Sequence, residues 1–166
     1  MSSTTIDPAA AAPQLVYVTR IRTTPAKLWE ALTQPDFIRQ YFFGRTNTSS
    51  WIPGEAIESR SPEGELEWHG TILKCVPEQE VVFTFKDIRA DEGPSTVTYR
   101  IDRPDASAGL ADPENYVQLT VIHNDFPVVS KIREQVSNGW PGIVAGIKTL
   151  LETGSTEVLA ATCHYE

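Results

Sequence analysis

The side chain in this sequence that is best suited to chemistry is the imidazole of His123. It continues the alternating apolar face of residues 117–121, so we expect it to point inward at the end of a strand. A buried neutral imidazole donates a hydrogen bond at one nitrogen and accepts one at the other. Three roles are open for His123: a polar anchor for a ligand, a proton-transfer group beside a substrate, or a structural residue bonded to backbone near Asn124 or Asp125.

Other residues that carry chemistry form weaker patterns. His69 lies beside Trp68 in a strand-like run and leaves the same roles open. Cys163, His164 and Glu166 suit zinc by their atoms, but a chain end offers no preorganised geometry. The sequence contains no Gly-rich phosphate loop, nucleophile elbow, His-Glu-x-x-His motif or Cys-x-x-Cys motif. We therefore predict no metal and no cofactor, and we assign no catalytic residue.

Carboxylates are abundant, and Glu63, Glu65 and Glu67 alternate along one run. Alternating charges along a strand usually belong to a face in contact with water. We expect these three glutamates to be solvated rather than to form a catalytic pair.

The composition is that of a globular domain, with 40% apolar and 22% charged residues among 166. The net charge of -8, without a cluster of Lys or Arg, disfavours nucleic acid as a partner. No apolar run approaches the roughly twenty residues of a membrane span, so no membrane partner is expected. Cys75 and Cys163 are expected to be free thiols, as in a cytoplasmic protein.

The elements that would position these residues begin with a strand from Gln14, whose residues Leu15, Tyr17, Thr19 and Ile21 share one face. Thr24 and Pro25 then predict a helix start, because the hydroxyl can cap the helix and proline suits its first position. Pro35 ends or restarts that helix, which predicts a second short helix over residues 36–42.

Alternating runs bounded by turn residues predict an antiparallel meander. The expected strands are a weaker one at residues 56–61 and four clear ones at residues 67–76, 81–87, 96–102 and 116–123. The connection over residues 103–114 is long and is expected to be a mobile loop.

The C-terminal third changes to helical spacing, with apolar residues at Trp140, Ile143, Val144, Ile147, Leu150 and Leu151. Gly154 is expected to end this amphipathic helix, which must cover the sheet. Residues 128–136 form either a separate helix or the first turns of the same one, since Gly139 and Pro141 permit a break or a kink.

Three motifs in this order resemble a known family: Leu28–Pro35 (LWEALTQP), His123–Phe126 (HNDF), and Gly139–Trp140 followed by residues 147–152 (IKTLLE). They are similar to proteins related to the C-terminal domain of the activator of the heat-shock-protein-ninety ATPase. The resemblance covers residues 16–154 and implies an α+β, helix-grip (START-like) fold with a curved antiparallel sheet around a long C-terminal helix. Residues 52–54 and Pro141 depart from the family pattern, which affects the expected shape of a pocket mouth.

The resemblance also implies a cavity, because a curved sheet and one helix cannot interdigitate along their whole length. Such a space would bind a small hydrophobic or aromatic molecule. We expect one domain over residues 14–155, between tails at residues 1–13 and 156–166. The candidate lining is aromatic and aliphatic, although any one such residue is more often ordinary core: Trp29, Phe37, Tyr41, Phe42, Trp51, Phe83, Phe85, Tyr99, His123, Trp140, Ile143 and Ile147.

The leading interpretation is a small-molecule binding module, with His123, Tyr99 or Tyr41 fixing the polar end of the ligand. Family analogy adds two alternatives: a co-chaperone-like contact with a heat-shock ATPase, and an enzyme of the cyclase or hydrolase type acting on a bound hydrophobic substrate. The same analogy implies a homodimer.

Overall fold

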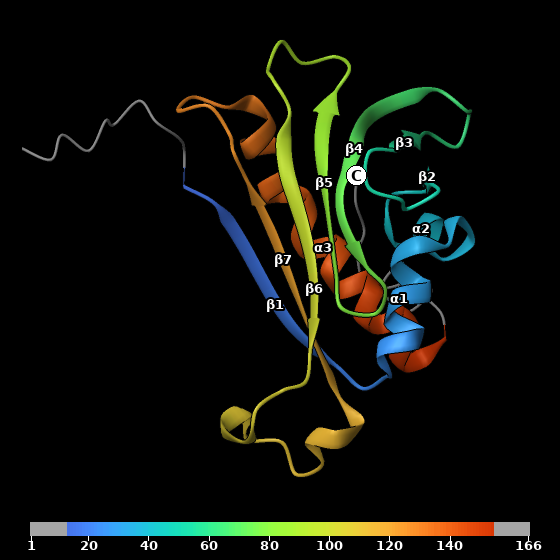
Figure 1. Cartoon of the computed structure of the whole chain (residues 1–166), viewed down its shortest axis with the longest axis vertical. Helices are drawn as coiled ribbons and strands as arrows, with labels where there is room; N and C mark the ends of the chain where they lie inside the picture. The colour runs from blue at the N-terminus through green and yellow to red at the C-terminus, as the bar shows by residue number, and fades with distance from the viewer. Residues whose placement is uncertain (1–12, 155–166) are drawn as a thin grey trace, which may run out of the picture.

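Seven antiparallel strands and three α-helices make up the described part of the chain, residues 13–154, in the computed structural model (Figure 1). The strands are β1 (Leu15–Ile21), β2 (Thr46–Ser49), β3 (Ala56–Arg60), β4 (Leu66–Val76), β5 (Glu80–Asp87), β6 (Ser95–Asp102) and β7 (Val117–Asn124). The helices are α1 (Pro25–Thr33), α2 (Pro35–Tyr41) and α3 (Lys131–Thr153). The predicted tails lie outside these residues except for Pro13, and so does the Cys163, His164 and Glu166 cluster.

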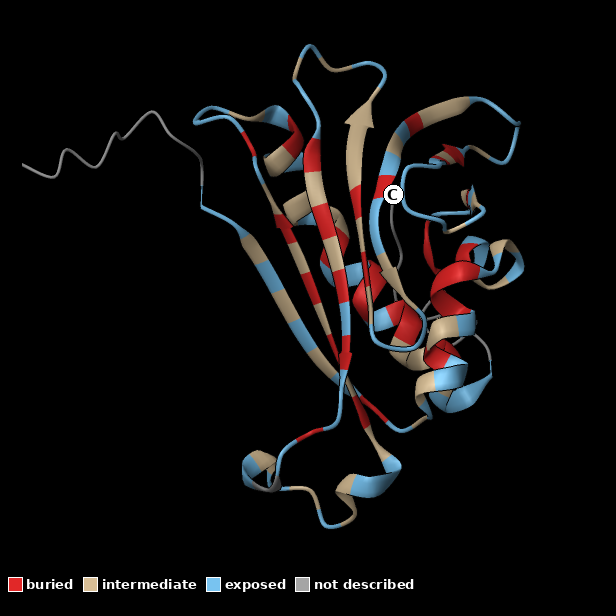
Figure 2. Cartoon of the chain, in the orientation of Figure 1, coloured by how far each residue is buried: buried red, intermediate tan, exposed pale blue. Residues whose placement is uncertain are grey.

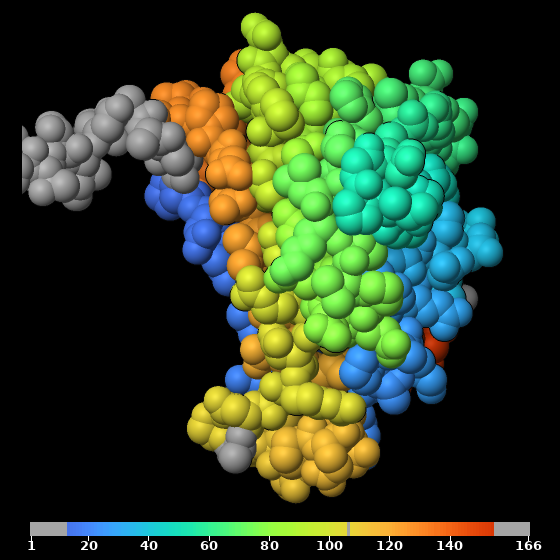
Figure 3. All heavy atoms as spheres, viewed as in Figure 1, coloured from blue at the N-terminus to red at the C-terminus, as the bar shows by residue number. Residues whose placement is uncertain are grey.

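The sheet has the order β1-β7-β6-β5-β4-β3-β2, with every neighbouring pair antiparallel. It curves around α3, and in a space-filling view from the same side the sheet hides most of that helix (Figure 3). This is the helix-grip arrangement that the family resemblance implied. Buried residues alternate with more exposed ones along β6 and β7 and in the first half of β5 (Figure 2). The helix α3 contributes a buried face of its own, so the core lies between the sheet and this helix.

The N-terminal helices form as their prolines and cap predict. The Thr24 hydroxyl accepts a hydrogen bond from the Lys27 amide at 3.2 Å, and Pro25 opens α1. Pro35 opens α2 in the same way. The Tyr41 hydroxyl donates to the Ala31 carbonyl at 2.7 Å, so the last turn of α2 is fixed against α1.

The strand β2 was missed by the sequence analysis. Its four residues, Thr-Asn-Thr-Ser, are all polar and contain no apolar alternation. It forms because β3 offers an edge, to which residues 46–49 pair in antiparallel register. Pairing with β3 thus decides the conformation of a segment whose own sequence does not predict a strand.

The helix α3 is continuous from Lys131, so residues 131–136 are its first turns rather than a separate helix, and residues 128–130 precede it. Ser130 caps it by accepting from the Arg133 amide at 2.9 Å, and Gly154 ends it with φ 82°. Pro141 lies inside the helix and cannot donate to the Ser137 carbonyl. The Tyr17 hydroxyl of β1 donates to that same carbonyl at 3.5 Å. A side chain from the sheet therefore compensates for the missing backbone bond.

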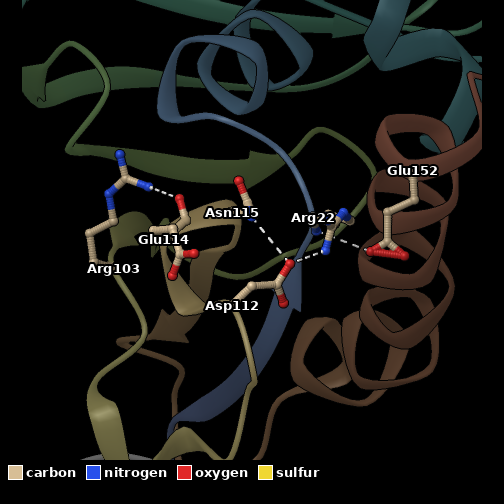
Figure 4. Close-up of polar contacts among 6 residues, drawn as sticks. All are labelled: Arg22, Arg103, Asp112, Glu114, Asn115 and Glu152. Atoms are coloured by element: carbon tan, nitrogen blue, oxygen red, sulfur yellow. Dashed lines mark hydrogen bonds and ion pairs between the residues drawn. The ribbon is translucent and has the colours of Figure 1, made fainter.

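The loop between β6 and β7 is tied to the rest of the molecule by polar contacts (Figure 4). Arg22, just after β1, forms a 2.6 Å ion pair with Asp112 of the loop, and its amide donates to the Glu152 carboxylate of α3 at 3.1 Å. Hydrogen bonding from Arg22 holds the pKa of Asp112 below its ordinary value. Two short 3-10 turns, Ala106–Ala108 and Pro113–Asn115, lie within the loop.

Among residues 13–154, no helix is both long and apolar enough to cross a bilayer.

Close packing of α2 on α3 requires a glycine at position 146. An alanine Cβ there would lie 2.8 Å from the Tyr41 Cβ, whereas at Gly142 a Cβ meets nothing within 4 Å. Gly146→Ala should lower the free energy of unfolding by about 1–3 kcal/mol through overpacking. The control Gly142→Ala should raise it by up to about 1 kcal/mol, because glycine is a poor helix former. Urea denaturation of both variants checks this, and equal responses would contradict the proposed close contact.

Candidate functional site

A pocket of about 190 Å³ lies on the concave side of the sheet, beside the N-terminal half of α3. Four segments supply its walls: residues 42–45 after α2, residues 67–68 of β4, residues 85–89 at the end of β5, and residues 135–143 of α3. The pocket therefore lies where α2, α3 and the ends of two central strands meet.

Aromatic rings form its apolar wall. The rings of Phe42 and Trp68 are 6.4 Å apart, as are those of Phe42 and Trp140, and Trp68 lies 4.7 Å from Phe85. Ring faces and edges set at such distances present a rigid apolar surface to a flat molecule.

Two acid–base pairs contribute charge to the lining. Arg45 forms an ion pair with Glu67, and its guanidinium lies 5.8 Å from the centre of the Phe43 ring. At the end of β5, the Asp87 carboxylate accepts from the Arg89 amide at 2.8 Å and lies 3.9 Å from the Arg89 guanidinium. Because the positive and negative charges balance, the lining does not require a charged occupant.

Glu67 reaches the pocket through a β-bulge. Ser59 of β3 pairs with Trp68, but the next residue, Arg60, pairs with Leu66, so Glu67 is the extra residue on β4. The prediction of a solvated side chain is wrong for Glu67, which is partly buried against Arg45. A bulge depends on pairing across strands and leaves no sign in the alternation of one strand.

The twelve candidate lining residues divide into three groups. Phe42, Phe85, Trp140 and Ile143 line the pocket. Tyr41, Phe83, Tyr99, His123 and Ile147 are buried in the hydrophobic core, while Trp29, Phe37 and Trp51 are partly buried against it. The structure therefore brings four of the twelve to the pocket, and the others fill or flank the core below and beside it.

His123 is fully buried, and both ring nitrogens are bonded to side chains. The Trp140 indole N–H, which can only donate, lies 3.0 Å from Nδ1, so that nitrogen must accept. The proton is then on Nε2, which donates to the Ser95 hydroxyl at 2.7 Å. The Ser95 hydroxyl in turn donates a hydrogen bond to the Phe85 carbonyl at 3.4 Å. Neither nitrogen remains free for a ligand, and neither is bonded to the backbone near Asn124 or Asp125.

The surroundings of His123 keep it uncharged. The rings of Phe126, Phe85 and Trp140 lie 4.5, 5.3 and 5.9 Å from the imidazole. Burial lowers the pKa of His123 to about 3. The residue thus holds Trp140, a pocket wall, in a fixed position as a neutral hydrogen-bonding bridge.

Several lining residues were not predicted from the sequence. Trp68 could have been found, because it shares the inward alternation of its strand with Ile72. The others come mainly from turns, a bulge and a helix face, where no alternation marks them: Phe43, Arg45, Glu67, Asp87, Arg89, Gln135, Val136 and Gly139. Within the described residues, no three His, Cys, Asp or Glu side chains are arranged to hold a metal ion.

Comparisons with known proteins identify the family to which this fold belongs. The family model described as Activator of Hsp90 ATPase homolog 1-like protein matches residues 22–152. No curated protein matches the sequence.

Solved structures share the fold. The Mesorhizobium loti protein MLL2253 is 21% identical with a TM-score of 0.67, over 84% of this chain and 96% of that one. The Aha1 dimer from Colwellia psychrerythraea is 16% identical with a TM-score of 0.65, over 86% and 98%. CalU16 from Micromonospora echinospora is 15% identical with a TM-score of 0.63, over 89% and 79%. At these identities the likeness establishes the fold alone.

The neutral state of His123 predicts a pH dependence of folding. Because its pKa falls from 6.5 to about 3 on folding, the unfolded chain binds the proton more readily. The resulting stability is fully present above pH 6.5 and is lost as the pH falls toward 3, at about 1.4 kcal/mol per pH unit. His123→Gln removes this proton linkage. The stability gap between the parent and His123→Gln should narrow from pH 7 to pH 5 in urea denaturation, and a constant gap would contradict the assignment.

Proposed function

Because this chain belongs to the family of Activator of Hsp90 ATPase homolog 1-like proteins, we propose that it is a binding module for a small aromatic molecule. The observation that carries the proposal is the pocket walled by Phe42, Trp68, Phe85 and Trp140. A concave site with aromatic walls and a few polar groups at its rim is typical of small-molecule binding.

The size of the pocket limits the ligand. At about 190 Å³ it is somewhat larger than a cavity of roughly 150 Å³ that binds benzene. It is smaller than the roughly 300–1,000 Å³ of sites that hold drug-sized molecules. The pocket therefore favours a molecule of one or two rings.

The alternative of an enzyme that uses His123 receives little support from the geometry. Proton transfer requires a ring nitrogen within reach of the substrate, but Trp140 and Ser95 occupy both nitrogens. A pKa of about 3 also makes His123 a poor base near neutral pH. Binding without His123-dependent chemistry is the function that these contacts favour.

The co-chaperone alternative rests on the description of the family alone. Steady-state ATPase rates of a heat-shock ATPase, measured with and without this protein, test it directly. A rate that changes with the concentration of this protein would favour that alternative over small-molecule binding.

The pocket can be filled by one substitution on α3. Gly139 lines the pocket, and a Cβ there would lie 3.7 Å from the Phe43 ring, in ordinary contact. We expect naphthalene to raise the Tm of the parent protein and to change tryptophan fluorescence, since Trp68 and Trp140 are walls. A ligand at about 100 times its Kd stabilises the folded state by about 2.7 kcal/mol. Gly139→Leu should abolish the shift in Tm.

The matched control is Gly142→Leu, which places the same side chain on an exposed position of the same helix. It should retain the response to naphthalene. Equal binding by both variants, or no binding of one- and two-ring aromatic compounds by the parent, would overturn the proposed function.

Self-association is a second proposal, favoured by the open edge of the sheet. The edge strand β1 exposes Val16 and Val18 to 47% and 54%, and the similar Colwellia protein is described as a dimer. Val18→Lys should convert a dimer into a monomer in analytical ultracentrifugation, because a charge on an apolar contact carries a desolvation cost. The control Leu73→Lys changes an exposed residue on β4. A monomeric parent protein would refute this proposal.

A further inference from the structure

A row of buried polar side chains crosses three strands and meets the pocket lining at one of its members, Trp68. Asn47 of β2 is opposite Ser59 of β3, and Ser59 is opposite Trp68 of β4. Residues directly opposite on antiparallel strands project from the same face, so these three side chains are neighbours. Their exposures are 4%, 0% and 3%. We call Asn47, Ser59 and Trp68 the polar row.

Each member of the polar row has a polar atom that its protein surroundings leave unsatisfied. Asn47 Oδ1, Ser59 Oγ and Trp68 Nε1 are buried and have no hydrogen-bond partner within residues 13–154. The other such atom, Oε2 of Glu67, faces Arg45 in an ion pair. Unsatisfied buried polar groups are costly and uncommon in folded proteins, so three on neighbouring strands call for a partner.

The contrast with His123 shows that this chain satisfies buried polar groups elsewhere. His123 uses Trp140 and Ser95, and the buried Tyr41 hydroxyl donates to the Ala31 carbonyl. The polar row is different because its partner does not come from the described protein.

The donors and acceptors of the polar row define that partner. The Asn47 oxygen can only accept, the Trp68 indole can only donate, and the Ser59 hydroxyl can do both. A carbonyl would satisfy Trp68 but not Asn47, and an ammonium would satisfy Asn47 but not Trp68. A hydroxyl donates and accepts through one atom and carries no charge into a buried site. Its chemistry fits all three positions.

Trp68 belongs both to the polar row and to the wall of the pocket. We propose that the polar row binds the hydroxyl group of the molecule held in the pocket. This inference rests on the proposed function and narrows it: the ligand is a one- or two-ring phenol or aromatic alcohol. Its rings lie against Phe42, Phe85 and Trp140, and its hydroxyl is directed toward β3 and β2.

A comparison of naphthalene with 2-naphthol tests the polar row. Water solvates the hydroxyl of 2-naphthol, so a purely apolar pocket would favour naphthalene. Because each net hydrogen bond is worth a factor of roughly 3 to 10, the parent protein should bind 2-naphthol about tenfold more tightly. Titration calorimetry measures both Kd values.

Two variants remove atoms of the polar row while keeping the shape of the site. Ser59→Ala and Asn47→Leu, neither of which is in the pocket lining, should each lower the preference for 2-naphthol toward unity and leave the Kd for naphthalene nearly unchanged. Thr48→Ala is the control, because Thr48 is an exposed residue of β2 between Asn47 and Ser49. It should keep the parent preference. The two test variants lie on different strands, so a folding defect in one leaves the other as the test.

The outcomes separate this inference from the proposed function. If the parent protein binds neither compound, both proposals fail. If it binds both but prefers naphthalene, or if neither test variant alters the preference, the pocket binds ligands and the polar row does not. A structural water would satisfy the same three atoms; Ser59→Ala would then lower the Tm of the ligand-free protein without changing the preference, and this result also overturns the inference.

Discussion

One hydrogen-bonded chain fixes the helix α3 against the sheet. It runs from the Trp140 indole through the His123 imidazole to the Ser95 hydroxyl and so joins α3 to β7 and β6. Apolar contacts between a helix and a sheet are not directional and permit some sliding or rotation. The three-residue chain has fixed donors and acceptors, so it selects one rotation of the helix. Because Trp140 is also a pocket wall, the same chain determines where that wall stands.

The fold was largely predictable because its elements are periodic and its caps are local. The burial of alternate residues in β6 and β7 follows their sequence pattern, and Thr24 with Pro25 opens α1 as its local chemistry dictates. The features that were missed or left open depend on partners in other segments of the chain. The strand β2 needs the edge of β3, and the continuity of α3 through Pro141 is supported by Tyr17 of β1. Neither the polar residues of β2 nor the turn of α3 at Pro141 shows in its own pattern that such a partner exists.

The site was less predictable than the fold for a related reason. Alternation identifies side chains that point inward, but it does not distinguish those that pack in the core from those that line a pocket. Phe83 and Phe85 share one face of β5, yet Phe83 is core and Phe85 is pocket wall. His123 pointed inward as expected, and its partners Trp140 and Ser95 came from other elements. The charged lining comes from a turn, a bulge and a strand end, where the sequence has no regular alternation of apolar and polar residues.

The two polar clusters of the interior differ in a way that bears on function. At His123 the donors and acceptors match within the protein, which stabilises one arrangement and leaves no capacity for a ligand. In the polar row the donors and acceptors do not meet each other, although Asn47, Ser59 and Trp68 lie on adjacent strands. Selection for stability alone would favour apolar residues there, since removing an unsatisfied buried group costs little or even stabilises. Retaining three such groups beside an aromatic pocket is reasonable where binding supplies the missing partner, as with residues that reduce stability at functional sites.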